Sequence, residues 1–176
     1  EYHSDDNNYN NVKAFVLDKL KSANSKNEIT PKDVVLYGFG RIGRLLAREL
    51  MAKTGKGNQL RLRAIVTRGT ITPEILEKRA NLLRTDSVHG QFMGTVDIDF
   101  KNKAMYINGT TVHIIEADNP EDIDYTQFGI ANALIIDNTG AFRDKEALSR
   151  HLKSKGSSQV LLTAPGKEIP NIVHGV

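Results

Sequence analysis

The segment VVLYGFGRIGRLLARELM, residues 34–51, joins two apolar patterns of different period through a glycine-rich turn. Residues 34–37 form a short apolar run that is typical of a buried strand. Residues 41–53 favour a helix, because apolar side chains recur at helical spacing along one face at Ile42, Leu45, Leu46 and Leu50. The segment therefore predicts a strand, a tight turn and a helix in direct succession.

The three glycines of this turn have the spacing Gly-x-Gly-x-x-Gly at Gly38, Gly40 and Gly43. In a dinucleotide-binding fold the first permits the tight turn, the second lets a diphosphate approach the main chain, and the third lets helix and strand pack closely. The free amides at the start of the following helix would face the phosphates from the positive end of the helix dipole. Because a strand precedes the motif and a helix follows it, residues 38–43, Phe39 included, are predicted to bind a dinucleotide. A glycine-rich turn without a ligand is the alternative.

Further apolar runs alternate with helical segments at residues 62–66, 133–136 and 160–162. Thr72 and Pro73 suit the start of another helix, which should end near Leu83, since Thr is a good N-cap and Pro fits the first turn. This alternation predicts an α/β fold: a Rossmann-like, mostly parallel sheet flanked by helices.

Residues 96–100, 105–107 and 111–115 follow a different pattern of short strands separated by turns. Asn108-Gly109 is a favoured two-residue hairpin connection. We therefore expect an antiparallel hairpin region inserted in the parallel sheet.

The second apolar run ends in Thr67-Arg68, where an NAD-binding strand usually carries an acid that binds the adenosine ribose. Thr67 has no charge, and Arg68 could pair with a 2′-phosphate through two parallel hydrogen bonds. The other interpretation leaves Arg68 in solvent. Both residues are candidate cofactor contacts, and the sequence leaves the choice between NAD and NADP open.

The chain has 176 residues, of which 39% are hydrophobic and 26% charged, enough for one domain with a sizeable core. The 24 Lys and Arg residues are scattered among 21 Asp and Glu residues, so no basic block indicates a nucleic-acid partner. No apolar stretch reaches the roughly 18 to 20 residues of a membrane span. The absence of cysteine excludes disulfides, thiolate metal sites and a thiol nucleophile within these residues. We expect a cytoplasmic protein.

The first thirty residues differ from the rest. Residues 1–11 are polar and predict a loose lead-in, and residues 12–22 predict a short amphipathic helix. Pro31 marks the start of a new unit. We therefore divide the chain into an N-terminal extension, residues 1–30, and a dinucleotide-binding domain, residues 31–176.

The chain resembles the phosphorylating glyceraldehyde-3-phosphate dehydrogenases from about residue 32 to residue 176. That family opens with asparagine followed by GFGRIGR; here Tyr37 replaces the asparagine. Several other segments match it in order: LLRTDSVHG (82–90), residues 107–109, Asn119-Pro120, DNTGAF (137–142), residues 160–166, Pro170 and Gly175-Val176. The N-terminal extension resembles that of a less common bacterial class.

The resemblance implies that the amides of Arg41 and Ile42 face the phosphates. It also implies further cofactor contacts at Asn138, Thr139, Gly140 and Thr163. Three departures from the family concern the cofactor site. They are Thr67 in place of the ribose acid, Asp118 in place of a basic residue near the adenine, and Asp137-Asn138 in place of Glu-Ser.

In this family a cysteine in a Ser-Cys-Thr-Thr-Asn segment attacks the aldehyde, a later histidine acts as base, hydride passes to the nicotinamide, and phosphate releases the acyl group. The resemblance implies that this catalytic domain lies beyond Val176, so we expect this fragment to bind dinucleotide and to be catalytically inactive. We assign no catalytic or metal role to any of the five histidines; His89 is interpreted as bracing a loop.

The resemblance also implies glyceraldehyde 3-phosphate and phosphate as substrates of a full-length homotetramer. Erythrose-4-phosphate dehydrogenase is an alternative, because it shares the same loop motifs. A free-standing dinucleotide-binding module is the other, and it requires a natural protein that ends near Val176.

Overall fold

The computed structural model describes residues 11–23, 30–54, 59–173 and 175. The chain divides into two compact units, Glu1–Thr30 and Pro31–Val176. In the first unit, α1 (Val12–Ala23) confirms the helix predicted at 12–22, and the Asn11 side chain accepts a hydrogen bond from the Ala14 amide at its start. The predicted lead-in lies outside the described residues apart from Asn11, and so does His174. No helix in the described ranges is long and apolar enough to cross a membrane.

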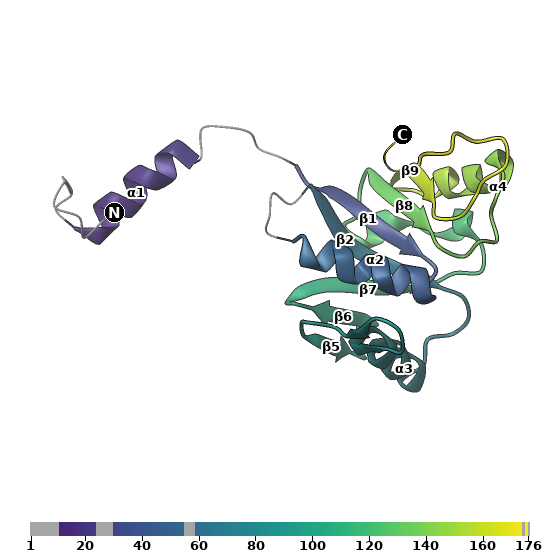
Figure 1. Cartoon of the computed structure of the whole chain (residues 1–176), viewed down its shortest axis with the longest axis horizontal. Helices are drawn as coiled ribbons and strands as arrows, with labels where there is room; N and C mark the ends of the chain where they lie inside the picture. Colours follow the sequence, from purple (N-terminus) through teal and green to yellow (C-terminus); the bar gives the residue numbers. More distant parts are fainter. Residues whose placement is uncertain (1–10, 24–29, 55–58, 174, 176) are drawn as a thin grey trace. The chain divides into compact units, whose positions relative to one another are not determined.

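The described part of the second unit contains a seven-stranded sheet of order β5-β6-β7-β2-β1-β8-β9. Its parallel part consists of β7 (Thr110–Glu116), β2 (Leu60–Thr67), β1 (Lys32–Tyr37), β8 (Ala133–Asp137) and β9 (Ser157–Leu162). From β1, the chain passes to β2 on one side and, later, to β8 on the other (Figure 1). This reversal of strand order is the arrangement of a doubly wound fold, and it confirms the predicted Rossmann-like sheet.

The predicted antiparallel region forms one end of the same sheet. β5 (Val96–Asp99) and β6 (Ala104–Ile107) pair antiparallel, and β6 pairs antiparallel with β7. Asn108 and Gly109 join β6 to β7 with φ angles of 49° and 77°, and two positive φ angles are what a tight type I′ hairpin turn requires.

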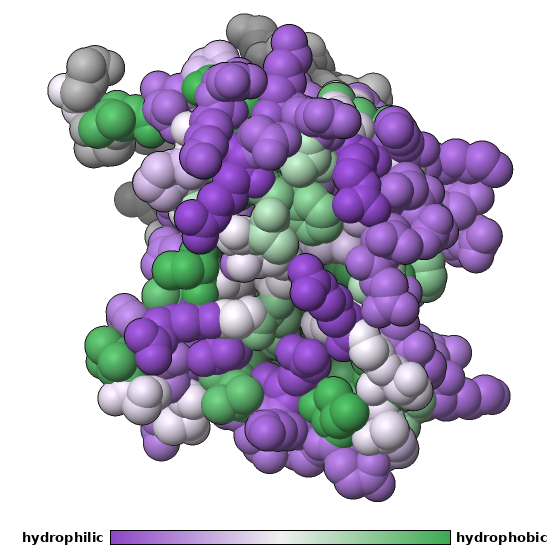
Figure 2. All heavy atoms as spheres, turned by 90° about the vertical axis from the view of Figure 1, so that its right-hand side faces the viewer, coloured by the Kyte–Doolittle hydropathy of each residue, from purple (hydrophilic) through white to green (hydrophobic). Residues whose placement is uncertain are grey.

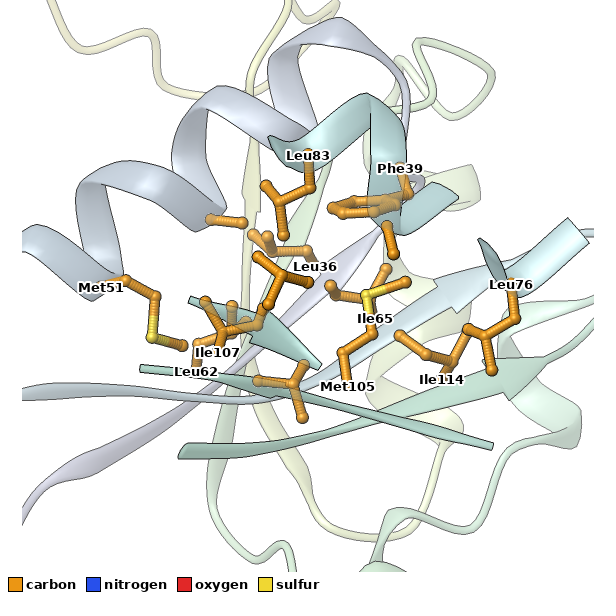
Figure 3. Close-up of a cluster of buried hydrophobic side chains, with 14 of the residues drawn as sticks. Leu36, Phe39, Met51, Leu62, Ile65, Leu76, Leu83, Met105, Ile107 and Ile114 are labelled. Atoms are coloured by element: carbon orange, nitrogen blue, oxygen red, sulfur yellow. The ribbon is translucent and has the colours of Figure 1, made fainter. Parts of the chain in front are cut away.

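Two helices cover one face of the sheet: α2 (Arg41–Ala52) and α3 (Pro73–Arg84). The Thr72 side chain accepts a hydrogen bond from the Ile75 amide, which confirms the predicted N-cap of α3. The core between helices and strands is apolar, with Leu36, Ile65 and Leu83 packed together (Figure 3).

The buried face of α2 agrees with the predicted one only in part, since Leu46 and Leu50 pack against the core. Gly43, Ala47 and Met51 are its buried residues, whereas the side chain of Ile42 is 47% exposed. Small residues at positions 43 and 47 let the helix axis approach the sheet, so the stripe that faces the core contains Gly and Ala as well as larger apolar side chains.

Short helical segments cover the opposite face of the sheet. They are η1 (Pro120–Asp122), η2 (Tyr125–Phe128), α4 (Lys145–Ser149) and η3 (Arg150–Lys153). Tyr125, Ile130 and Leu148 lie in a second apolar cluster with the other face of β1 and β8. The sequence pattern did not predict the three 3₁₀ segments, because three or four residues are too few to show a period.

A two-stranded sheet, β3 (Thr85–Asp86) and β4 (Gly90–Gln91), frames the loop after α3. The buried Asp86 carboxylate accepts hydrogen bonds from the amides of Val88 and His89 and contacts Nδ1 of His89, each at 3.0 Å. His89 therefore braces the loop, as the sequence analysis expected. The His89 ring is the main cause that holds the pKa of Asp86 well below its usual value, followed by the two amides.

The replacement Asp86→Asn keeps an acceptor oxygen for the loop amides and removes the charge. We expect the wild-type chain to have the larger free energy of unfolding at neutral pH. Because the folded carboxyl has the lower pKa, this advantage should be lost as the pH falls below about 4, the usual carboxyl pKa in an unfolded chain. Urea unfolding of both chains across this range measures the difference, and a difference that does not vary with pH would contradict the role of the Asp86 charge.

Candidate functional site

The carboxyl ends of β2, β1 and β8 meet at one edge of the sheet. The strand pairs place Tyr37 beside Val66 on one side and beside Asp137 on the other. The residues that follow these strands are therefore neighbours at the position where the strand order reverses, which is where open α/β sheets bind ligands. Figure 2 looks onto the side where β1 ends and α2 begins, and shows a mostly hydrophilic face with a less polar band down its middle.

The glycine turn has the close approaches that its spacing predicts. Gly38 has a φ of +98°, and its amide donates to the Val66 carbonyl at 2.9 Å. A methyl group at Gly43 would lie 2.3 Å from the Gly38 carbonyl oxygen, whereas one at Gly40 would meet nothing within 4 Å. Gly38 and Gly43 are thus required by the fold, and Gly40 leaves its surroundings open.

The first turn of α2 presents main-chain amides at this opening. Gly40 is the N-cap and has no side chain that could accept from the amides of Arg41 and Ile42. Both of these residues have exposed side chains. Unpaired amides at a helix start form a favourable site for an anion. Phe39 is different, because its side chain is buried in the core at 5% exposure, so only its main chain faces the turn (Figure 3).

The end of β2 carries no free carboxylate. Thr67 is 4% exposed, and its hydroxyl has no hydrogen-bond partner among the described residues, whereas Arg68 is exposed. The acid paired with Thr67 across the strands, Glu116, already accepts from the Ile71 amide and from Lys103. The hydrogen bond from Lys103, then that from Ile71, lowers the pKa of Glu116.

The turn after β8 is held by hydrogen bonds from several directions. The Asp137 carboxylate Oδ1 accepts from the Thr139 amide and the Thr139 hydroxyl, both at 2.7 Å. The Thr163 amide and hydroxyl donate to the Asp137 carbonyl at 3.1 Å, and the same hydroxyl lies 3.3 Å from the Asn138 side-chain oxygen. Gly140 continues the turn with a φ of 66°. The structure thus brings Asn138, Thr139, Gly140 and Thr163 together.

The glycine turn and the turn after β8 are in contact. A methyl group at Gly38 would lie 2.9 Å from the Thr139 Cγ2 atom, so the Thr139 methyl already occupies the space beside Gly38. The main-chain amide of Asn138 also donates to the Tyr37 carbonyl at 2.8 Å. The two turns therefore form one continuous surface, and Thr67-Arg68 lies at the end of the next strand.

One buried pair behind this surface was not predicted from the sequence. Nε2 of His151 lies 2.9 Å from Oδ2 of Asp137, and both side chains are fully buried. His151 was assigned no role, and Asp137 was noted only as a departure from the family. A charged residue at the end of a buried strand was the available signal, because such a group needs a partner.

A family model described as the NAD-binding domain of glyceraldehyde 3-phosphate dehydrogenase matches residues 32–145. The chain belongs to this family. It is 58% identical over 145 residues, 82% of its length, to a glyceraldehyde-3-phosphate dehydrogenase-like protein of Pseudomonas aeruginosa, covering 31% of that protein. It is 35% identical over 133 residues, 76% of its length, to glyceraldehyde-3-phosphate dehydrogenase of Lactococcus lactis, covering 36% of it.

A fungal relative shows a similar identity and a similar coverage. Glyceraldehyde-3-phosphate dehydrogenase 1 of Schizosaccharomyces pombe is 34% identical over 144 residues, 81% of this chain and 39% of that protein. The chain thus spans about a third of the length of the curated relatives it matches. It corresponds to the NAD-binding domain of this family, and the cofactor of that domain is NAD(P).

Two glycine variants separate packing from access to the dinucleotide. Gly43→Ala forces a methyl group against the Gly38 carbonyl, and we expect it to lower the free energy of unfolding by about 2 kcal/mol. Gly40→Ala has room for its methyl group, so it should cost less than about 1 kcal/mol, the preference of a helix N-cap for Gly over Ala, while the methyl group obstructs close approach of a diphosphate to the main chain. Thermal unfolding and calorimetric titration with NAD measure the two effects. Equal NAD affinity of the wild type and Gly40→Ala would argue against a diphosphate on this turn.

Proposed function

We propose that the full-length protein is a phosphorylating glyceraldehyde-3-phosphate dehydrogenase and that this chain holds its cofactor. The reaction converts glyceraldehyde 3-phosphate, inorganic phosphate and NAD(P)⁺ to an acyl phosphate, NAD(P)H and a proton. The observation that carries the proposal is the turn at Gly38–Gly43, which lies between strand and helix at the reversal of strand order in a chain of this family.

In this proposal the residues of this chain bind the cofactor and orient it. The amides of Arg41 and Ile42, at the uncapped start of α2, receive the diphosphate. Asn138, Thr139, Gly140 and Thr163 line the neighbouring strand ends and contact the rest of the cofactor. When bound, the nicotinamide accepts a hydride.

The chemical step belongs to residues outside this chain. These 176 residues contain no cysteine, so in this proposal the thiol nucleophile lies in a part of the full-length protein outside this chain. We propose that this fragment binds the cofactor and catalyses nothing alone, and that the complete protein is a cytoplasmic homotetramer that needs neither a membrane nor nucleic acid.

An assay of the full-length protein tests the activity directly. With glyceraldehyde 3-phosphate, phosphate and NAD⁺ or NADP⁺, we expect reduced cofactor to accumulate only when phosphate is present, whereas the 176-residue chain should produce none. Faster turnover of erythrose 4-phosphate would favour erythrose-4-phosphate dehydrogenase instead. No turnover of either aldehyde, with dinucleotide still bound, would favour a binding module.

We propose that the end of β2 accepts NADP as well as NAD. A 2′-phosphate is repelled where a carboxylate binds the ribose, but the buried Thr67 hydroxyl is neutral. Glu116 is engaged by Lys103 and the Ile71 amide. Arg68 is exposed and makes no hydrogen bond or ion pair with any residue that the structure describes, so its guanidinium is available to a phosphate.

The variant Arg68→Ala tests this specificity. We expect NADP affinity to fall about tenfold, as for loss of a charge-assisted hydrogen bond, while NAD affinity stays within about twofold. The control Lys101→Ala removes an exposed positive charge from the turn between β5 and β6 and should change neither affinity. Parallel titrations with NAD and NADP measure the ratio. If Arg68→Ala leaves the ratio of NADP affinity to NAD affinity unchanged, Arg68 does not bind the 2′-phosphate.

A further inference from the structure

A fully buried acid and histidine lie directly behind the candidate cofactor surface. Asp137 is the last residue of β8, and His151 lies in η3. Both side chains have 0% exposure, and their Oδ2 and Nε2 atoms are 2.9 Å apart. Burying a carboxylate is costly unless hydrogen bonds satisfy it, so a pair in this position has a structural or functional cause.

The Asp137 carboxylate uses its two oxygens for different partners. Oδ2 faces His151, and Oδ1 accepts from both the amide and the hydroxyl of Thr139. The carboxylate thus connects a buried side chain to an exposed residue of the turn after β8. Any shift of the carboxylate moves the acceptor on which the Thr139 turn depends.

The surroundings of His151 fix both its tautomer and its orientation. Nδ1 is buried and has no hydrogen-bond partner among the described residues, so a proton there would be a buried donor without an acceptor. We therefore assign the Nε2–H as the donor to Oδ2 of Asp137. The rings of Tyr37 and Phe142 pack edge-on against it, with centroids 4.6 and 5.2 Å away.

The contacts continue from Thr139 to the glycine turn. The Thr139 methyl group fills the space beside Gly38, and Gly38 in turn is the residue whose carbonyl lies against Gly43. A series of contacts therefore runs from His151 through Asp137 and Thr139 to Gly38. It links the buried pair to the residues proposed to hold the dinucleotide.

We propose that Asp137 and His151 are positioning residues for the dinucleotide: the His151 Nε2–H holds the Asp137 carboxylate so that it fixes the Thr139 turn against Gly38. Neither residue contacts the cofactor in this proposal, which rests on the proposed function of the site. The pair acts on affinity, because a turn that is already fixed loses less conformational freedom when the ligand binds.

Two replacements of His151 separate this role from simple packing. His151→Leu removes the donor and leaves Oδ2 without its partner, and we expect NAD to bind about tenfold more weakly, because the loosened Thr139 turn must then be ordered when the ligand binds. His151→Gln offers a neutral side-chain N–H that can donate to Oδ2, and we expect NAD affinity within about threefold of the wild type. Calorimetric titration of the 176-residue chain with NAD, together with thermal unfolding, measures both effects.

Two controls account for lost stability and for the loss of a histidine. Met105→Ala removes a fully buried side chain from β6 in the antiparallel region, so it should lower the unfolding temperature and leave NAD affinity unchanged. His113→Leu makes the same substitution on β7, where the ring packs beside Phe128, and should also leave NAD affinity unchanged. Should His151→Leu fail to fold, Phe142→Leu loosens the ring while keeping the pair, and we expect about threefold weaker NAD binding.

The outcomes are distinct. Weak binding by His151→Leu, restored by Gln and absent from both controls, supports the proposal. Wild-type affinity in a folded His151→Leu chain, or in Phe142→Leu where His151→Leu does not fold, would overturn it and leave the proposed function intact. Equally weak binding by Leu and Gln would overturn the role of the Nε2–H. A wild-type chain that binds no dinucleotide would overturn the proposed function itself, and this inference with it.

Discussion

The close approach of α2 to the end of β1 is the constraint on which the rest of the site depends. Gly43 lies so near the Gly38 carbonyl that even a methyl group would be 2.3 Å from its oxygen. This contact fixes where α2 begins, and hence where the amides of its uncapped first turn lie. Gly38 itself has a positive φ, which glycine adopts without strain, and it lies against Thr139 at the strand end of β8.

The turn after β8 and the glycine turn together form the candidate site. Thr139 occupies the space beside Gly38, and Asp137 holds Thr139 through its amide and hydroxyl. The two turns come from strands far apart in the sequence, and they meet because β1 and β8 are hydrogen-bonded neighbours with Tyr37 beside Asp137. The site therefore depends on the sheet register as much as on the glycine motif.

Local patterns predicted the parts of this arrangement that are local. The glycine motif, the Thr72 N-cap and the Asn108-Gly109 hairpin each depend on residues within one turn of one another, so their sequence signals are complete in themselves. The buried face of α2 was predicted only in part: Leu46 and Leu50 do pack against the core, but hydrophobicity also marked the exposed Ile42, whereas closeness to the sheet selected Gly43 and Ala47. The pair of Asp137 and His151 could not be predicted by period or motif, since its partners lie 14 residues apart and meet only through the packing of η3 on the sheet.

The distribution of charge at the sheet edge connects the two proposals. The end of β2 is neutral at Thr67, so no carboxylate acts on a ligand there. An acid does lie at the edge, at the end of β8, but Asp137 is fully buried and its oxygens are occupied by Thr139 and His151. Burial, followed by the charge of Asp137, raises the pKa of the adjacent Tyr37 to about 12, so its hydroxyl stays neutral as well. The surface offered to an anionic ligand thus consists of main-chain amides, hydroxyls and the exposed Arg68, while the negative charge of this edge serves to hold the surface in place.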